Sequence, residues 1–157
     1  MLSALQEYGV RCLLQLARQP GGEPLTAREI AEAEGLSTPY VEKILSQVRE
    51  RGLIHSMRGV HGGFLLAKPA EHISLREVFA VFGGPLYSEQ FCGRFTGLRE
   101  ACVHTGNCGI RPVWSFLTRE LDRIMARTSL KDLLHDEGVV AQQMVARWEV
   151  VTATRSA

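Results

Sequence analysis

Three cysteines, Cys92, Cys102 and Cys108, lie within one short stretch of this chain, where their thiols could bind a metal centre. Nine residues separate the first two and five separate the last two, whereas zinc sites usually pair cysteines about two to four residues apart. Wide spacing on a glycine-rich segment favours an iron–sulfur cluster, whose irons take thiolate ligands from several directions. From spacing alone, two alternatives stay open: a pair of thiols that forms a disulfide on oxidation, and an inert surface loop.

A cluster bound by three cysteines leaves one ligand position for another group. His104 and Asn107 are candidates within the same stretch, and Glu100 is more remote. The fourth cysteine is different, because Cys12 falls on the apolar side of a predicted helix over residues 2–18. We therefore interpret Cys12 as a buried structural thiol and not as a ligand.

The elements before the cysteines predict a mainly α protein with a small β-hairpin wing. Thr26 and Glu29 have the spacing of a capping box at the start of a second helix, which Gly35 ends. Ser37 is the expected N-cap of a third helix, with a buried apolar stripe up to Gly52. Four further segments follow, namely strands over 53–57 and 64–67, the turn 58–63 between them, and a helix over 74–82. Two short helices followed by a glycine-tipped hairpin predict a winged helix-turn-helix.

The start of the third helix and the hairpin tip carry side chains suited to DNA. Glu42 can accept a hydrogen bond from a cytosine amino group, which only a base edge offers. Arg58 at the hairpin tip can contact phosphates or enter a minor groove. The full set of predicted DNA-contacting residues is Thr38, Tyr40, Glu42, Lys43, Arg58 and His61.

The sequence predicts four parts, and its net charge and motifs restrict the possible functions. We expect a winged-helix DNA-binding domain over 1–82, a cysteine-containing cluster loop over 83–110, a dimerisation helix over 111–128 and a helical tail over 129–157. The net charge is only +1, so any DNA-binding charge must be local. No catalytic or nucleotide motif points to an enzyme. No signal peptide or membrane span is evident, which predicts a cytoplasmic protein with no membrane partner.

Several runs of residues resemble the winged-helix iron–sulfur transcription regulator family that includes IscR, NsrR and RirA. The likeness extends to about residue 135 and includes the three cysteines and the helix start around Pro112 and Trp114. The matching runs are 35–45, 51–54, 56–66, 73–78 and 129–134. The resemblance implies double-stranded DNA as a partner, contacted by Thr38, Tyr40, Glu42 and Arg58. It also implies a homodimer held by the long helix after the cysteines.

The same resemblance implies a [4Fe-4S] or [2Fe-2S] cluster on Cys92, Cys102 and Cys108, with gene control by cluster state. This chain departs from the family in its longer first cysteine gap and in Arg111, which stands where IscR-like members carry a histidine ligand. NsrR-like members use an acidic residue near the start of the first helix, reaching across from the partner subunit. Glu7 matches that position. The alternatives for the fourth ligand are His104, water, a small thiol or nothing.

The expected function is therefore an iron–sulfur-sensing transcription regulator and not an enzyme. Iron supply, nitric oxide, oxygen or redox state could each act on such a cluster. The alternative is a cluster-free winged-helix regulator that responds to cysteine oxidation or to a partner enzyme. An iron–sulfur carrier protein would leave the wing unexplained.

Overall fold

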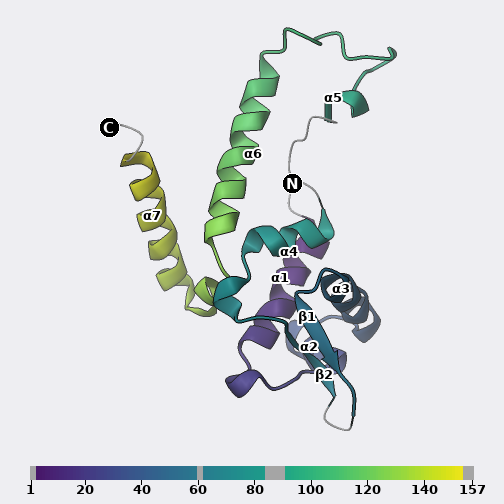
Figure 1. The fold of residues 1–157 in the computed structure, drawn as a ribbon, viewed down its shortest axis with the longest axis vertical. Helices are drawn as coiled ribbons and strands as arrows, with labels where there is room; N and C mark the ends of the chain where they lie inside the picture. The colour runs from purple at the N-terminus through teal and green to yellow at the C-terminus, as the bar shows by residue number, and fades with distance from the viewer. Residues whose placement is uncertain (1–2, 60–61, 84–90, 154–157) are drawn as a thin grey trace.

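The computed structural model describes residues 3–59, 62–83 and 91–153 of the 157-residue chain. Figure 1 shows a winged-helix part at one end and two helices, α6 and α7, that project from it. The α-helices are α1 (Ala4–Ala17), α2 (Ala27–Glu34), α3 (Thr38–Glu50), α4 (Leu75–Phe82), α5 (Phe91–Arg94), α6 (Ile110–Arg127) and α7 (Glu137–Ala153). The strands are β1 (Ile54–Met57) and β2 (Gly63–Leu66), and the 3-10 turns are η1 (Pro20–Gly22), η2 (Ala70–His72) and η3 (Lys131–Leu134). The predicted mainly α fold with a hairpin wing is confirmed.

Helices α2 and α3 form the helix-turn-helix and pack with α1 around one apolar core. The predicted capping box at Thr26 and Glu29 is present at the start of α2. Ser37 caps α3 as expected, although its side chain makes no capping hydrogen bond. Periodic apolar residues of the three helices, with neighbours from other elements, are the buried ones: Cys12, Leu13, Leu16, Ile30, Ala31, Val41, Ile44, Leu45 and Val48. The predicted buried stripe of the third helix is thus confirmed.

The hairpin is an antiparallel pair in which Ile54 lies opposite Leu66 and Met57 opposite Gly63. The strand limits differ slightly from the prediction. Strand β1 begins after Leu53, which is buried, and β2 ends before Ala67. The backbone N–H of Leu25 donates to the carbonyl of Phe64 at 3.0 Å, which attaches the hairpin to the segment before α2. The wing is therefore fixed to the helix-turn-helix at its base.

The segment after α6 belongs to the winged-helix core, a role that the sequence analysis did not expect for the tail. The N–H of Leu75 donates to the carbonyl of Thr128 at 2.8 Å, and the N–H of Leu130 donates to that of Ile73 at 2.9 Å. Leu130 is fully buried within the main core. The foot of α6 is thereby joined by backbone hydrogen bonds to the start of α4.

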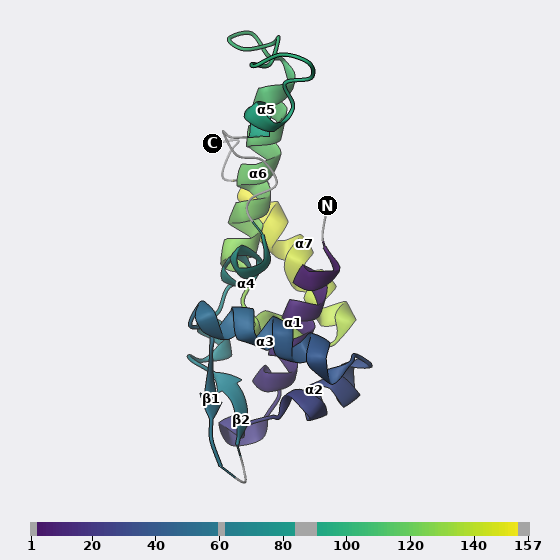
Figure 2. The ribbon, with the colours of Figure 1, turned by 90° about the vertical axis from the view of Figure 1, so that its right-hand side faces the viewer.

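After residue 82 the structure differs from the sequence prediction in one additional helix and in the start of the long helix. The stretch 83–110, expected to lack helical structure, contains the single-turn helix α5. The long helix begins at Ile110, two residues before Pro112, because proline lacks only an N–H that a first turn leaves unpaired anyway. Figures 1 and 2 show α6 rising from the winged-helix part, with α7 returning from its foot. No helix in the described residues is long and apolar enough to cross a membrane.

Candidate nucleic-acid interface and cysteine segment

Helix α3 presents a polar side away from the core. Glu42 and Lys43 are exposed, and Thr38 at the first position is half-buried. The opposite side of the helix packs inward through Val41 and Ile44, which have no exposed surface. The arrangement leaves the start of α3 accessible, as a recognition helix requires. The contacts that these residues make with DNA stay predictions.

Tyr40 has a packing role that sequence reasoning missed. Its ring meets that of Tyr8 edge-on, with centroids 5.9 Å apart and planes at 84°. The guanidinium of Arg11 lies 5.3 Å from the centroid of the Tyr8 ring. Since aromatic pairs of this geometry stabilise packing, Tyr40 helps to hold α3 against α1, and this contact also fixes where its ring can point.

The turn of the helix-turn-helix is held to α1 by a nearly buried carboxylate. Arg11 Nε donates to Glu34 Oε2 at 2.6 Å, and the amide of Gln15 donates to the other oxygen. The hydrogen bond that Arg11 donates to Glu34 is the main cause of the raised pKa of Arg11. These residues come from segments that are far apart in sequence, so no local pattern could have revealed the pair.

The structure describes the hairpin up to Gly59 and again from Gly62, and His61 lies outside the described residues. Arg58 follows β1 and is exposed, as a DNA-contacting side chain should be. Gly59 has a φ of +120°, which favours glycine. A Cβ added at Gly62 would lie 2.6 Å from the Met57 carbonyl oxygen. Glycine is thus favoured at Gly59 and Gly62, on either side of the tip, and Arg58 lies directly after β1.

The three clustered cysteines are all half-buried and lie on two adjoining structures. Cys92 is in α5, whereas Cys102 and Cys108 lie in the loop that leads to α6. The carbonyl of Cys102 accepts hydrogen bonds from the N–H and the hydroxyl of Thr105, at 3.0 and 2.7 Å. In the described residues no disulfide joins these thiols. Nor does that part of the chain gather three or more His, Cys, Asp or Glu side chains into a metal site.

The chemistry of this donor set nevertheless fits an iron–sulfur cluster. Three thiols are available from one segment, and soft iron–sulfur irons prefer thiolate to oxygen ligands. Cys108 stands two residues before α6, whose N-terminal dipole favours negative charge. Binding would require the loop to bring Cys92, Cys102 and Cys108 closer together, and no regular helix or strand spans residues 95–109 to oppose this.

Glu7 and Cys12 occupy opposite sides of α1. Glu7 is exposed in the first turn, so its carboxylate can reach outward as expected. Cys12 is fully buried, and burial is the main cause that raises the pKa of its thiol to about 12. A thiol that stays protonated in an apolar core is a poor metal ligand, which agrees with the structural role expected for Cys12.

Comparison with known proteins identifies one family over most of the chain. The model of the Rrf2 family, described as iron-dependent transcriptional regulators, matches residues 2–136. An HTH-type transcriptional regulator of Synechocystis is 32% identical over 135 residues, covering 86% of this chain and 88% of the relative. IscR of Photorhabdus laumondii is 28% identical and covers 88% of this chain and 82% of its own.

Solved structures agree with the sequence comparison. T. potens IscR superposes with a TM-score of 0.68 at 27% identity, covering 85% of each chain. The oxidized form of Staphylococcus aureus CymR superposes with a TM-score of 0.68 at 26% identity, covering 87% of this chain and 97% of that one. Since each superposition covers at least 85% of this chain, the similarity extends beyond the winged helix.

Proposed function

Because this chain belongs to the Rrf2 family of transcription regulators, we propose that its affinity for operator DNA depends on an iron–sulfur cluster. The chain is a DNA-binding transcription regulator and not an enzyme. Cys92, Cys102 and Cys108 would hold the cluster, of the [4Fe-4S] or [2Fe-2S] type. When bound, the cluster would supply a group whose charge and ligands change with redox state or with attack by a small molecule.

The observation that carries this proposal is the position of the three thiols between two parts of the fold. Their segment leaves the winged helix at Phe82 and enters α6 at Ile110. Phe82 packs on α1, and the foot of α6 is hydrogen-bonded to the start of α4. A change of shape in the cysteine segment would therefore act on the winged helix from both of its ends.

The proposed regulator works as a homodimer through α6. Several large apolar side chains of this helix are exposed in the single chain, Val113 by 46%, Leu117 by 40%, Leu121 by 45% and Ile124 by 37%. A stripe of this kind on a soluble protein favours a contact with another chain. Two winged helices held at a fixed distance could then contact two half-sites of one operator.

The fourth cluster ligand in this proposal is Glu7 of the partner subunit's first helix. Its exposure and its place in the first turn of α1 support an outward reach. Such a ligand would connect the cluster of one subunit to the winged helix of the other, so that loss of the cluster changes how the two wings are held.

A cluster-free regulator that responds to cysteine oxidation is the second candidate. The half-buried thiols of one loop favour it, since two of them could meet in a disulfide. The similarity to a CymR structure solved in an oxidized form points the same way.

Anaerobic purification separates the two candidates. Visible absorption with stoichiometric iron and sulfide is expected from the cluster regulator, together with a change in operator affinity when a chelator removes the cluster. DNA from upstream of the chain's own gene is the first operator to test. A colourless, iron-free protein whose DNA affinity changes only with thiol oxidation would support the second candidate instead.

A further inference from the structure

A groove rich in arginine lies where α4 meets α6, apart from the cysteine segment and the wing. Four arginines line it, Arg76 from α4 and Arg119, Arg123 and Arg127 from α6, together with the single acid Asp122. Its volume is ≈ 580 Å³, within the range of roughly 300–1,000 Å³ that small-molecule sites occupy. The lining therefore has four arginines against one acid, an excess of three positive charges.

Ion pairs within the described chain leave part of this charge uncompensated. Arg123 is paired with Glu120 at 2.8 Å, and Arg76 only weakly with Asp122 at 3.4 Å. For the side chains of Arg119 and Arg127, no ion pair is recorded in the described residues. Within the described ranges, two permanently charged guanidinium groups thus lie in the groove without a counter-ion, which favours an anion there.

A buried hydroxyl in the groove also lacks a partner. Thr118 is one of the residues that line the same hollow, and its Oγ1 is inaccessible to solvent and has no hydrogen-bond partner in the described part of the chain. Since buried polar atoms are usually paired, this hydroxyl would gain a partner only if the wall of the groove moves when a ligand binds.

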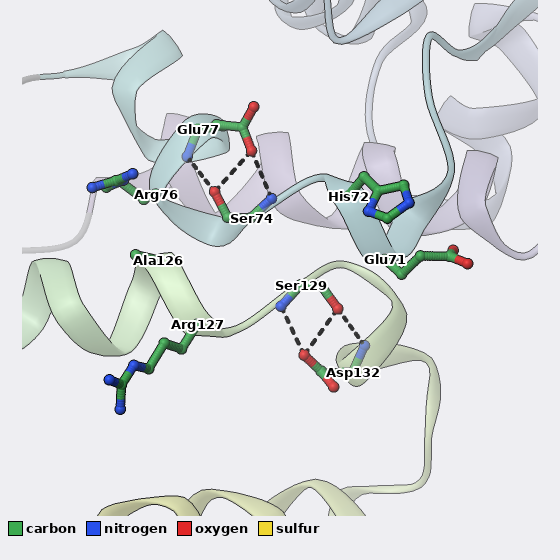
Figure 3. Close-up of a pocket in the computed structure, with 9 residues that line it drawn as sticks. All are labelled: Glu71, His72, Ser74, Arg76, Glu77, Ala126, Arg127, Ser129 and Asp132. Atoms are coloured by element: carbon green, nitrogen blue, oxygen red, sulfur yellow. Dashed lines mark hydrogen bonds between the residues drawn. The ribbon is translucent and has the colours of Figure 1, made fainter. Parts of the chain in front are cut away.

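An adjoining hollow towards the foot of α6 shares Arg76, Ala126 and Arg127 with the groove. Glu71, Glu77 and Asp132 also line this hollow, so the excess of positive charge is confined to the groove itself. Figure 3 shows Arg76 and Arg127 on either side of Ala126, with the caps of Ser74 and Ser129 beyond them. In both overall views strands β1 and β2 extend to the side of the winged helix that faces away from α6 (Figures 1 and 2). A duplex on the wing tip would leave this groove open, so a small molecule fits it better than operator DNA.

We propose that this groove binds a small polyanion, with two or more phosphate or carboxylate groups, as an effector of the regulator. Arg119 and Arg127 are eight residues apart on α6, so each would hold a separate anionic group through bidentate hydrogen bonds, while Arg76 binds from α4. Because Arg76 belongs to α4 and the others to α6, the ligand would connect the two helices. Its binding would fix the angle between the winged helix and the dimer helix, and would thereby alter operator affinity.

Isothermal titration calorimetry on the anaerobically purified full-length protein tests the proposal, with pyrophosphate and citrate as separate probes at constant ionic strength. The variant Arg119→Gln/Arg127→Gln removes two charges that have no recorded ion pair. Its matched control is Arg18→Gln/Arg51→Gln, two exposed arginines outside the groove. We expect binding of at least one probe, weakened about tenfold or more by the groove variant and unchanged by the control. Circular dichroism verifies that both variants fold.

The two probes and the oligomeric state make every outcome decisive. Preference for pyrophosphate identifies a phosphate ligand, and preference for citrate a carboxylate ligand. No binding, or equal weakening in both variants, overturns the proposal. If the groove variant alone becomes monomeric in sedimentation, the groove is a subunit contact and the proposal is wrong. Probe binding and oligomeric state are both measured without reference to iron content, so failure of the groove proposal does not contradict the cluster proposal.

Discussion

The ring of Phe82, the last residue of α4, lies directly against the backbone of Gly9 in α1. A Cβ added at Gly9 would stand 2.1 Å from Phe82 Cε2 and 2.6 Å from Cζ. Glycine at position 9 therefore allows α4 to end against α1, and this contact fixes the point where the cysteine segment begins. Both helices belong to the winged-helix core, so the contact is expected to matter for stability as well as for position.

Gly9→Ala should destabilise the protein by about 1–3 kcal/mol, because the added methyl forces the Phe82 ring aside. Urea unfolding measures the loss. Gly138→Ala is the control, since nothing lies within 4 Å of a Cβ there. Adding Phe82→Leu to Gly9→Ala should recover part of the loss. If the double variant is no more stable than Gly9→Ala alone, Phe82 is not the source of the clash.

Local sequence signals predicted most of the winged helix. The capping box at Thr26 and the periodic apolar residues act over three or four positions, so each can be recognised without knowing the fold. The recurring glycines likewise indicated the turn at the hairpin tip. Burial of Cys12 followed from its place on the apolar side of α1.

Contacts between distant segments could not be predicted in this way. Arg11 meets Glu34, and Leu130 completes a core built by residues 12–78, only because the chain folds back on itself. The short helix α5 was missed because four residues carry too little periodicity to detect. The arginine groove is a property of two helices together, and neither shows it alone.

Removal of Arg58 and Glu42 should affect DNA binding in different ways. Arg58→Ala should weaken binding to all sequences and lower the slope of log affinity against log salt by about one, if its charge meets phosphates. Glu42→Ala should cost little affinity but reduce base discrimination by about 1–3 kcal/mol, because a carboxylate is repelled by phosphates and suits only a base donor. Fluorescence anisotropy on operator and scrambled duplexes measures both. Unchanged sequence preference in Glu42→Ala would exclude Glu42 as a base contact.

Acid should loosen the attachment of α7. Arg147 donates to both oxygens of Asp132, at 2.6 and 3.1 Å, and this hydrogen bonding is the main cause that lowers the pKa of Asp132 from 3.8 to about 2. Since the folded pKa is the lower one, the contribution to stability is complete above about pH 4 and is lost as the pH falls towards 2.

Solvent around Arg147 should limit this contribution to about 1 kcal/mol. Urea unfolding at pH 5 and at pH 3 should show Asp132→Asn less stable than the unmodified protein at pH 5, with a smaller difference at pH 3. Asp136→Asn, an exposed neighbour, is the control. A difference that is the same at both pH values would contradict the ion pair as its cause.

Charge placed in the apolar stripe of α6 should separate the proposed dimer. Leu117→Glu and Leu121→Glu each put a carboxylate where a partner helix would bury it, and an unpaired buried charge is costly. Sedimentation velocity at micromolar concentration should show the unmodified protein as a dimer and these variants as mostly monomer. Val145→Glu, the same kind of change at an exposed site of α7, should remain dimeric. A monomeric unmodified protein would reject the dimer.

Replacement by serine should remove the cluster at three of the cysteines and leave it intact at Cys12. Cys92→Ser, Cys102→Ser and Cys108→Ser should each abolish or severely destabilise the cluster, because a hydroxyl binds iron–sulfur irons far more weakly than a thiolate. Cys12→Ser should keep full iron and sulfide content, with Cys12→Ala as a second variant that adds no buried hydroxyl. Loss of the cluster in both Cys12 variants, with retention in one of the others, would mean that the ligand set is wrong.

Glu7→Ala should give an intermediate result, in which the cluster assembles but decays sooner in air. A carboxylate exchanges more readily than a thiolate, so its loss exposes one iron without dismantling the three-cysteine site. Operator affinity of this variant should respond less to cluster removal, because the link to the partner's first helix is gone. Glu23→Ala, another exposed glutamate, is the control. The assignment is falsified if Glu7→Ala matches the unmodified protein in both cluster lifetime and DNA response; His104 would then be the next ligand to test.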